Sequence, residues 1–275
     1  MTNFAIFIIS HARVDKQVTL KSLIKSGYTG DWYIVVDDLD PQLKDYQSKF
    51  GDNLLVFNKE SIRTEFDTMD NFANMSSAMY ARNYCTQKAC ELGIKYFGLF
   101  DDDIEHFVVR YDDDGSLISY DISDINKFLD EYIHYMDSCN ISCVGFGNEG
   151  GYIGGTGGKF SKGYGRHINQ AFIVNSNDSI DFPGTQNEDF NACCKHFDKV
   201  FIELYSGISI STPPRSSNSG GNNYANAGGL YVSNFYSVMM SPSFNEIFLR
   251  NGNVTLYRNW DAFVPKIISD RFKVN

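Results

Sequence analysis

The chain has 275 residues, of which 43% are hydrophobic and 15% aromatic, and its formal net charge is -10 at pH 7. This composition predicts a globular protein, and the length fits one α/β domain with a full core. The charge argues against a protein whose whole surface binds nucleic acid, because phosphate contacts require Lys and Arg. A local basic patch is still compatible with it.

Targeting and redox signals point to the cytoplasm. No apolar run approaches the roughly 20 residues that a membrane span needs, and residues 4–9 are too short and too lightly flanked by positive charge for a signal peptide. The six cysteines show neither paired CxxC spacing nor the density of a secreted disulfide scaffold. We therefore expect reduced thiols in a cytoplasmic protein, the host cytoplasm if a phage encodes it.

Strands and helices alternate in the first hundred residues. Apolar runs predict strands at residues 4–9, 32–36, 54–57 and 96–100. Between them, apolar residues at three- and four-residue steps predict two helices, one capped by Asp15 and stopping at Gly27, the other running from Asn74 to Leu92. This order is typical of βαβ units, and near-continuous apolar strands predict a parallel sheet covered on both faces.

The second half has a mixed pattern. An Asp-Gly pair within residues 111–116 predicts a hairpin turn, and Ser123 can cap a further helix. Short strands are expected at residues 142–146, 171–174 and 200–204. Two segments rich in Gly, Ser or Asn, near residues 147–166 and 212–229, are expected to be mobile loops, the second a lid candidate.

Three polar clusters follow expected strands, at residues 10–13, 37–38 and 101–103. In an open α/β sheet, ligands bind beyond the carboxyl ends of the parallel strands. Any one cluster can also be explained by a solvated turn or a helix cap, and for Asp37 and Asp38 alone this explanation has equal weight. Three of them on one sheet edge favour a ligand site.

The cluster of Asp101, Asp102 and Asp103 is the most informative of the three. Adjacent carboxylates repel one another, so a cation is expected beside them. Asp101 and Asp103 present two carboxylates on one side of the chain, which suits Mg²⁺ or Mn²⁺ held against a pyrophosphate. The alternative is that the acids cap a turn.

Two further segments carry charged residues of interest. Arg82 and Asn83 lie on the helix before the acidic cluster, where Arg82 can reach the same ligand or form an interhelical ion pair. Glu188 and Asp189 begin a short expected helix, whose dipole favours acids in its first turn. A carboxylate at this place is also suited to act as a general base. No HExxH spacing occurs, so zinc hydrolysis is not expected.

Five short motifs, taken in their order along the chain, resemble those of a GT-A nucleotide-sugar glycosyltransferase. They are Ser-His-x-Arg, Val-Val-Asp-Asp, Ala-Arg-Asn, Asp-Asp-Asp and Asn-Glu-Asp. More narrowly, residues 8–13, 26–37, 92–97 and 264–267 resemble the TET/JBP-associated glycosyltransferases, largely bacteriophage enzymes that glycosylate hydroxymethylated pyrimidines in DNA. The resemblance implies a Rossmann-like mixed sheet flanked by helices in a single domain, residues 1–275. Residues 1–103 would bind the nucleotide-sugar and residues 104–275 the acceptor.

The resemblance also implies roles for individual residues. The nucleoside contacts of a UDP-sugar would be Ser10, Arg13, and Asp37 or Asp38, and Asp102 is counted with the donor-binding residues. Arg82 and Asn83 would support the pyrophosphate or the sugar. Asp101 and Asp103 would hold the divalent metal, Mn²⁺ or Mg²⁺. Asp189, with Glu188 beside it, would take the acceptor hydroxyl proton in an inverting transfer.

One departure from the GT-A pattern concerns the metal. Many GT-A enzymes add a metal-binding His near the C-terminus, whereas no His follows His196 here. Residues 257–260 occupy the corresponding region. Either the metal is held more weakly, or Arg258 supplies positive charge directly to the diphosphate.

The favoured function is transfer of glucose, arabinose or a similar sugar from a UDP-sugar to a 5-hydroxymethylcytosine-type base in phage DNA. Such a base must be flipped out or unpaired to reach the site. The candidate DNA phosphate contacts are Lys159, Lys162, Arg166, Arg250, Arg258, Lys266, Arg271 and Lys273. The alternatives are a glycan, lipid or protein acceptor, mildly favoured by the net charge, and a non-catalytic nucleotide-sugar or nucleic-acid binding module. The acids at 101, 103 and 189 argue against the last.

Overall fold

The computed structural model describes residues 3–69, 75–113, 116–148, 152–153, 159–160, 164–165, 167–213, 229–250 and 253–259. Chain contacts group the protein into two compact units, residues 1–222 and 223–275, and each is described by itself. The single domain expected from the sequence stays a prediction. None of the described helices combines the length and apolarity that a membrane crossing needs.

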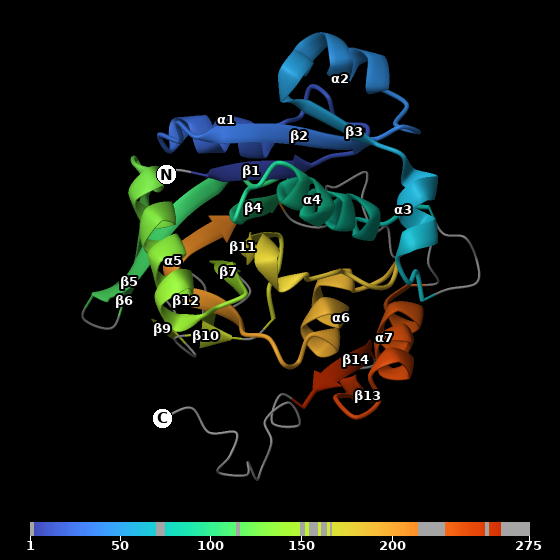
Figure 1. The fold of residues 1–275 in the computed structure, drawn as a ribbon. Coiled ribbons are helices and arrows are strands. Elements are labelled where there is room, and N and C mark those ends of the chain that lie inside the picture. Colours follow the sequence, from blue (N-terminus) through green and yellow to red (C-terminus); the bar gives the residue numbers. More distant parts are fainter. Residues whose placement is uncertain are drawn as a thin grey trace. The chain divides into compact units, whose positions relative to one another are not determined.

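One mixed sheet organises the first unit (Figure 1). Its strands are β1 (Phe4–Ile9), β2 (Asp31–Asp37), β3 (Leu54–Phe57), β4 (Tyr96–Asp101), β5 (His106–Asp113), β6 (Ser116–Asp121), β7 (Cys143–Asn148), β10 (Tyr164–Gly165), β11 (Ala171–Asn175) and β12 (Phe201–Ser211). The order is β3-β2-β1-β4-β11-β7-β12-β5-β6, with β10 paired to β12. The first four strands in this order are parallel, and β11 runs antiparallel to both β4 and β7.

Helices pack on both faces of this sheet. They are α1 (Val18–Lys25), α2 (Leu43–Phe50), α3 (Lys59–Glu65), α4 (Met79–Glu91), α5 (Ile125–Cys139) and α6 (Glu188–Lys195), with the short 3-10 helices η1 (Gly51–Asn53) and η4 (Ser176–Asp178). Side chains alternate between the faces along each strand. Ile6 and Ile8 of β1 therefore share one core with Leu23 of α1, Tyr46 of α2 and Leu129 of α5.

Helix α4 covers the opposite face. Phe7 of β1 packs edge-on against Phe97 of β4 on this face, with ring centroids 5.6 Å apart. Tyr84 of α4 stacks on Phe57 of β3 at 5.1 Å, and the guanidinium of Arg82 lies 5.3 Å from the ring of Phe172 in β11. The helix thus carries a charged side chain into an aromatic layer, close to the carboxyl end of β4.

The predicted side-chain caps of two helices are wrong. Helix α1 begins after Gln17 rather than Asp15, and the backbone N–H groups of Val18 and Thr19 donate to the Asp102 carbonyl at 3.1 and 3.2 Å. Helix α5 begins after Asp124, with no side-chain cap from Ser123; Ile125 N–H donates to the Ser26 carbonyl at 2.8 Å. Carbonyls from distant parts of the sequence satisfy the first N–H groups, which a local pattern does not reveal.

Other sequence predictions agree with the structure. Gly27 follows α1 with a φ of +78°, a left-handed conformation that glycine adopts without strain. Strands β5 and β6 pair as the expected hairpin. Of the two predicted loops, residues 152–153 (β8, Tyr152–Ile153) pair with residues 159–160 (β9, Lys159–Phe160). Most of both loops lies outside the described residues.

Gly207 lies in the irregular part of β12, where its register with β7 shifts between Leu204 and Ser209. Ile208 N–H donates to the Tyr132 hydroxyl at 2.8 Å, and a Cβ at position 207 would overlap that hydroxyl. Gly207→Ala is expected to lower the free energy of unfolding by about 1–3 kcal/mol, measured by urea denaturation. In a Tyr132→Phe background the loss should be smaller. An equal loss in both backgrounds would contradict the steric explanation.

The second unit contains α7 (Gly229–Met240), β13 (Asn245–Arg250) and β14 (Asn253–Arg258). The two strands form an antiparallel hairpin. Asn245 is buried at the start of β13, and its amide donates to the carbonyls of Ser237 and Ser241 at 3.0 and 3.1 Å. This amide joins the end of α7 to the hairpin.

Candidate active site

The carboxyl ends of β1, β2, β3 and β4 meet at one edge of the sheet. The register places Ile9 beside both Val35 and Asp101, and Asp37 beside Phe57. The polar residues that follow these strands therefore lie together, as the sequence predicted. Because side chains alternate at this edge, Asp101 points to the α4 face and Asp102 to the α1 face.

Asp102 anchors the acidic turn on the α1 side. Its Oδ2 accepts from Ser10 Oγ at 2.6 Å, and its Oδ1 accepts from Arg13 Nη1 at 2.6 Å. Burial raises the pKa of Asp102, although Arg13 and Ser10 oppose the shift. With both oxygens engaged and the side chain buried, Asp102 is placed to orient Ser10 and Arg13 rather than to contact a ligand itself.

Asp101 and Asp103 are the more accessible acids of the turn. Asp101 has a side chain that is 26% exposed, and Asp103 Oδ2 lies 3.8 Å from Arg13 Nη1. Burial raises the pKa of Asp101 to about 7, and the charges of Asp103 and Asp102 add to this effect against Arg82. Negative charge at the end of β4 is thus incompletely neutralised by the protein, which is a setting that favours a bound cation.

Arg82 connects this turn to α6. Its residue is 3% exposed, its Nη2 donates to Asp101 Oδ1 at 3.4 Å, and its Nε lies 3.6 Å from Glu188 Oε1. Its Nε and Nη1 have no hydrogen-bond partner among the described residues. Burial alone would lower the pKa of Arg82, but Glu188 and Asp101 raise it above its ordinary value, so the guanidinium stays charged. The expected interhelical pair is in fact a bridge from β4 through α4 to α6.

Asp189 lies beside Glu188 in the first turn of α6. Its Oδ1 accepts from the Phe190 N–H at 2.7 Å, and its Oδ2 is 3.6 Å from His167 Nε2. Burial would raise the pKa of Asp189, but His167 and Arg82 hold it well below its ordinary value. Asn187 precedes α6 with a φ of +54° and no side-chain cap bond. Asp189 is therefore an ionised carboxylate, as a proton acceptor must be.

The side chains of Asn83 and Asp38, for which the resemblance implied donor contacts, are hydrogen-bonded within the fold. Asn83 is fully buried; its Nδ2 donates to the Phe182 carbonyl at 2.9 Å and its Oδ1 accepts from the Phe182 N–H at 2.8 Å. Asp38 accepts from Asn58 Nδ2 at 2.6 Å and from the Lys59 N–H at 3.0 Å. Both side chains are engaged by the fold, Asn83 holding the segment before α6 and Asp38 the start of α3.

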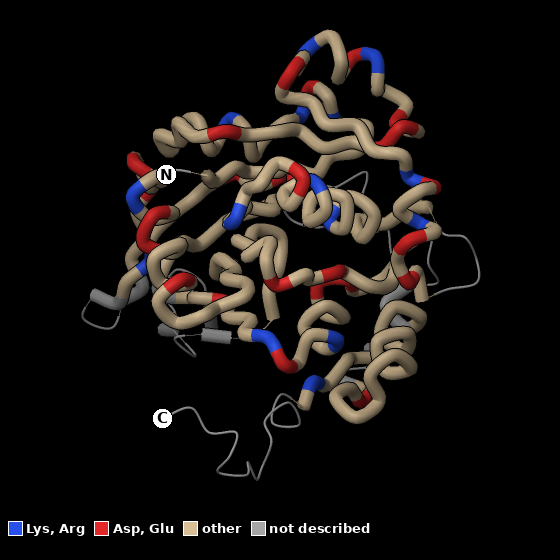
Figure 2. Tube along the Cα trace, in the orientation of Figure 1, with Lys and Arg blue, Asp and Glu red and all other residues tan. Residues whose placement is uncertain are grey.

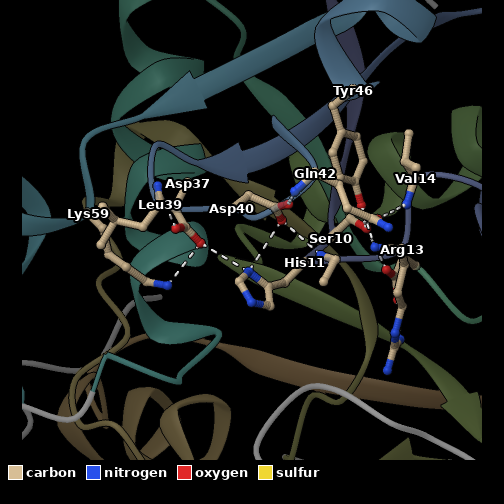
Figure 3. Close-up of polar contacts among 12 residues, drawn as sticks. Ser10, His11, Arg13, Val14, Asp37, Leu39, Asp40, Gln42, Tyr46 and Lys59 are labelled. Atoms are coloured by element: carbon tan, nitrogen blue, oxygen red, sulfur yellow. Dashed lines mark hydrogen bonds and ion pairs between the residues drawn. The ribbon is translucent and has the colours of Figure 1, made fainter. Parts of the chain in front are cut away.

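Asp37 belongs to a polar cluster at the ends of β2 and β3 (Figure 3). Its Oδ2 accepts from Lys59 Nζ at 2.9 Å and lies 3.4 Å from His11 Nδ1. Asp40 Oδ2 is 3.3 Å from the same His11 nitrogen and accepts from the Ala12 N–H at 2.8 Å. Burial would raise the pKa of Asp37, but His11 and Lys59 lower it to about 2. Asp37 is thus a buried, ionised acid.

Several residues of this edge were not predicted from the sequence. Lys59, Asp40 and Tyr46 were not singled out, although Lys59 comes two residues after the third strand. Tyr46 bonds Ser10 Oγ at 2.8 Å and accepts from the Arg13 N–H at 3.0 Å. A search for polar residues just beyond every predicted strand would have found Lys59. Tyr46 carries no such signal, because it lies within α2.

Most of the predicted basic contacts fall outside the residues that the structure describes. Arg258 ends β14 in the second unit, so its place at the diphosphate stays a prediction. Lys162, Arg166, Lys266, Arg271 and Lys273 fall outside the described residues, as do the side chains of Lys159 and Arg250.

The candidate metal ligands at this edge are the two more accessible acids of the turn, Asp101 and Asp103. In the part of the chain that the structure describes, no three His, Cys, Asp or Glu side chains are grouped closely enough to hold a metal. Asp101 and Asp103 provide carboxylate oxygens, the ligands that Mg²⁺ and Mn²⁺ prefer. Two acids suit an ion that keeps waters and takes further oxygens from a phosphate ligand, as Mg²⁺ does. The donor set therefore fits a divalent metal bound together with its substrate.

Known structures share this architecture. Glucosyl-3-phosphoglycerate synthase from Mycobacterium tuberculosis, solved with Mg²⁺ and UDP, aligns with a TM-score of 0.50 at 10% identity, covering 93% of this chain and 86% of that one. The same enzyme with Mn²⁺, UDP-glucose and phosphoglyceric acid gives a TM-score of 0.50 at 9% identity with the same coverage. At this identity the likeness shows the fold alone, a GT-A glycosyltransferase fold. No curated protein matches the chain.

A family model gives the more specific match. The model of the TET-associated glycosyltransferases matches residues 4–199, which include the strand-end clusters, the acidic turn, Arg82 and the start of α6. Both the predicted GT-A fold and the suspected family are thereby confirmed. The chain belongs to the TET-associated glycosyltransferase family.

Proposed function

We propose that this glycosyltransferase moves a sugar such as glucose or arabinose from a UDP-sugar to the hydroxyl of a 5-hydroxymethylcytosine-type base in DNA. The observation that carries the proposal is the meeting of three groups at one sheet edge. These are the acidic turn at residues 101–103, the strand-end cluster around Ser10 and Asp37, and the carboxylate of Asp189, which the bridge through Arg82 and Glu188 joins to the turn.

The donor side is supported by charge. Arg13 and Arg82 flank the acidic turn, and their positive charges would offset part of the negative charge of a diphosphate. Asp101 and Asp103 would hold Mg²⁺ or Mn²⁺. When bound, the metal would stabilise negative charge that develops on the leaving diphosphate. Ser10, which Asp102 orients at the end of β1, and Asp37, which ends β2, are the residues that would contact the nucleoside.

The chemical step assigned to the protein is a proton transfer. In an inverting reaction, the acceptor hydroxyl oxygen bonds to the anomeric carbon as the bond from that carbon to the diphosphate oxygen breaks. The hydroxyl proton passes to Asp189, and UDP leaves with the bonding electrons. Asp189 is ionised and lies close to the positive charge of Arg82. The same group of charges would therefore bind the donor through the acidic turn and hold the base, Asp189, at the start of α6.

The DNA acceptor rests on the family resemblance and requires an extruded base. Figure 2 shows Lys and Arg interspersed with Asp and Glu along the described trace. Acceptor binding that depends on a local basic group is compatible with the net charge of -10. The same charge favours a glycan, lipid or protein acceptor as the second candidate, which the test below separates.

The test is transfer to defined DNA. The protein is incubated with Mn²⁺, a panel of UDP-sugars and duplex or single-stranded DNA containing 5-hydroxymethylcytosine, and the digested nucleosides are analysed by mass spectrometry. The expected result is one nucleoside heavier by a sugar residue, absent from the same DNA with unmodified cytosine. Absence of any sugar on DNA, with transfer to a glycan acceptor instead, would overturn the DNA assignment.

Asp103→Asn tests the metal assignment. Loss of one of two carboxylates should abolish measurable transfer and raise the Mn²⁺ concentration needed for tight UDP binding by at least about tenfold. Calorimetric titration of UDP at several Mn²⁺ concentrations measures the second effect. Asp121→Asn, at an exposed acid ending β6, is the matched control and should behave as wild type. Unchanged turnover of Asp103→Asn would remove Asp103 from the metal role.

A further inference from the structure

His11 is the one exposed member of an otherwise buried group of four charged or titratable side chains. The side chains of Asp37, Asp40 and Lys59 are 6%, 0% and 9% exposed, whereas that of His11 is 49% exposed. His11 Nδ1 lies 3.4 Å from Asp37 and 3.3 Å from Asp40. The two carboxylates therefore fix the orientation of the imidazole from within the fold.

The charge balance of this group favours a protonated imidazole. Asp37 and Asp40 carry two negative charges and Lys59 one positive charge, which leaves one buried negative charge uncompensated. Protonated His11 makes the group neutral, and burial of unpaired charge is costly. In agreement, the hydrogen bond to Asp37 raises the pKa of His11, with the charges of Asp37 and Asp40 acting in the same direction against burial and Lys59.

The other edge of the imidazole points away from the carboxylates (Figure 3). With Nδ1–H directed at Asp37 and Asp40, a protonated ring presents Nε2–H outward as a charged donor. A donor of this kind binds acceptor oxygens, and hydrogen bonds with a charged partner are stronger than neutral ones.

Position along the edge indicates which part of a ligand this donor meets. Arg13 turns toward β4, where it contacts Asp102 and Asp103, while His11 turns toward the ends of β2 and β3. In the proposed donor site, the acidic turn holds the diphosphate while Ser10 and Asp37 contact the nucleoside, so the nucleoside lies on the His11 side. We propose that His11 is a specificity residue for the donor, presenting a protonated Nε2–H to a carbonyl or hydroxyl oxygen of the nucleoside. The inference rests on the proposed UDP-sugar donor.

Two variants of His11 separate the charge from the donor atom. His11→Gln places an uncharged N–H near the position of Nε2, and His11→Asn retains only a donor near the position of Nδ1. Binding of uridine, UDP and inorganic pyrophosphate is measured by calorimetry from pH 6 to 8.5 at fixed Mg²⁺. The wild-type Kd for uridine and for UDP should rise about tenfold over this range. His11→Gln should show no such rise, and His11→Asn should bind about tenfold more weakly at pH 6.

The matched control is His134→Gln, an exposed histidine on α5, which should follow wild type. Any pH response common to wild type and His11→Gln belongs to other groups, the acidic turn included, and is subtracted. Proton NMR of the histidine rings gives a second readout: saturation with uridine should raise the pKa of His11, because the protonated form binds better.

Each contrary result would overturn a different statement. If wild type binds UDP but His11→Gln shows the same pH response, His11 is structural and the inference is overturned while the proposed donor stands. If pyrophosphate shows the His11-dependent response and uridine does not, His11 faces the diphosphate and the nucleoside assignment is overturned. If wild type binds no UDP at any pH, the proposed function itself falls.

Discussion

Asp189→Asn is expected to lower the turnover number about 10²–10⁴-fold while leaving the Kd for UDP unchanged. The amide that replaces the carboxylate cannot accept the hydroxyl proton, but it is nearly isosteric and can keep the contact with the Phe190 N–H. Because His167 and Arg82 hold the pKa of Asp189 low, the wild-type base stays ionised down to acidic pH. Steady-state kinetics with a saturating acceptor, together with calorimetric UDP binding, measure both quantities.

A second aspartate–histidine pair provides the control. Asp181 Oδ1 lies 2.8 Å from His196 Nε2 and its Oδ2 accepts from Lys195 at 2.6 Å, also on the segment around α6. Asp181→Asn should leave turnover close to wild type, since this pair lies apart from the bridge through Arg82. If Asp189→Asn lost UDP affinity in proportion to turnover, Asp189 would be a structural acid of the α6 N-terminus and not the base.

Arg82→Met is expected to lower the free energy of unfolding by about 3–5 kcal/mol at pH 8. Methionine can occupy the space over the rings of Phe172 and Phe182, so the loss is mainly electrostatic: the partly buried Asp101 and the buried Glu188 are left without their shared cation. Urea denaturation in EDTA, which excludes compensation by a metal, measures the effect. Lys88→Met, which removes a surface ion pair with Glu91 on the same helix, should change stability little.

The Arg82→Met loss should depend on pH. Asp101 has a folded-state pKa raised from 3.8 to about 7, so the folded protein binds more protons than the unfolded chain between these values and stability falls as pH rises through them. Arg82 opposes that shift, and its removal raises the pKa of Asp101 further. The variant should therefore lose less stability at pH 5, where Asp101 is protonated, than at pH 8. An equal loss at both values would contradict the assigned ion pair.

The sequence was sufficient to predict the strand-end edge, because its signals are local. Apolar runs predicted β1, β2, β3 and β4, and polar clusters directly after the first, second and fourth of these runs marked the edge, with the acids at 101–103 after the fourth. Parallel pairing then brings the clusters together without any further information. The Asp-Gly hairpin and the stop at Gly27 were predictable for the same reason, since turn chemistry depends on a few consecutive residues.

Contacts between residues that are far apart in the sequence could not be predicted from it. Asn83 looked like a polar helix residue suited to a ligand, yet its amide is bonded on both sides to Phe182, 99 positions away. Arg82 and Glu188 are joined across more than a hundred residues. Helix α1 lacks a side-chain cap because a carbonyl from residue 102 serves it. Only the folded chain shows which polar group meets which.

The contacts between α1 and the acidic turn have a consequence for ligand binding. Val18 and Thr19 N–H hold the Asp102 carbonyl, and the Thr19 hydroxyl donates to the Asp101 carbonyl at 2.6 Å while accepting from the Ile104 N–H at 2.9 Å. The turn is therefore preorganised by the first helix before any donor arrives. Donor binding therefore does not have to offset a loss of conformational entropy from ordering the turn. A one-residue deletion between Val14 and Val18, remote in sequence, would displace the turn as a unit.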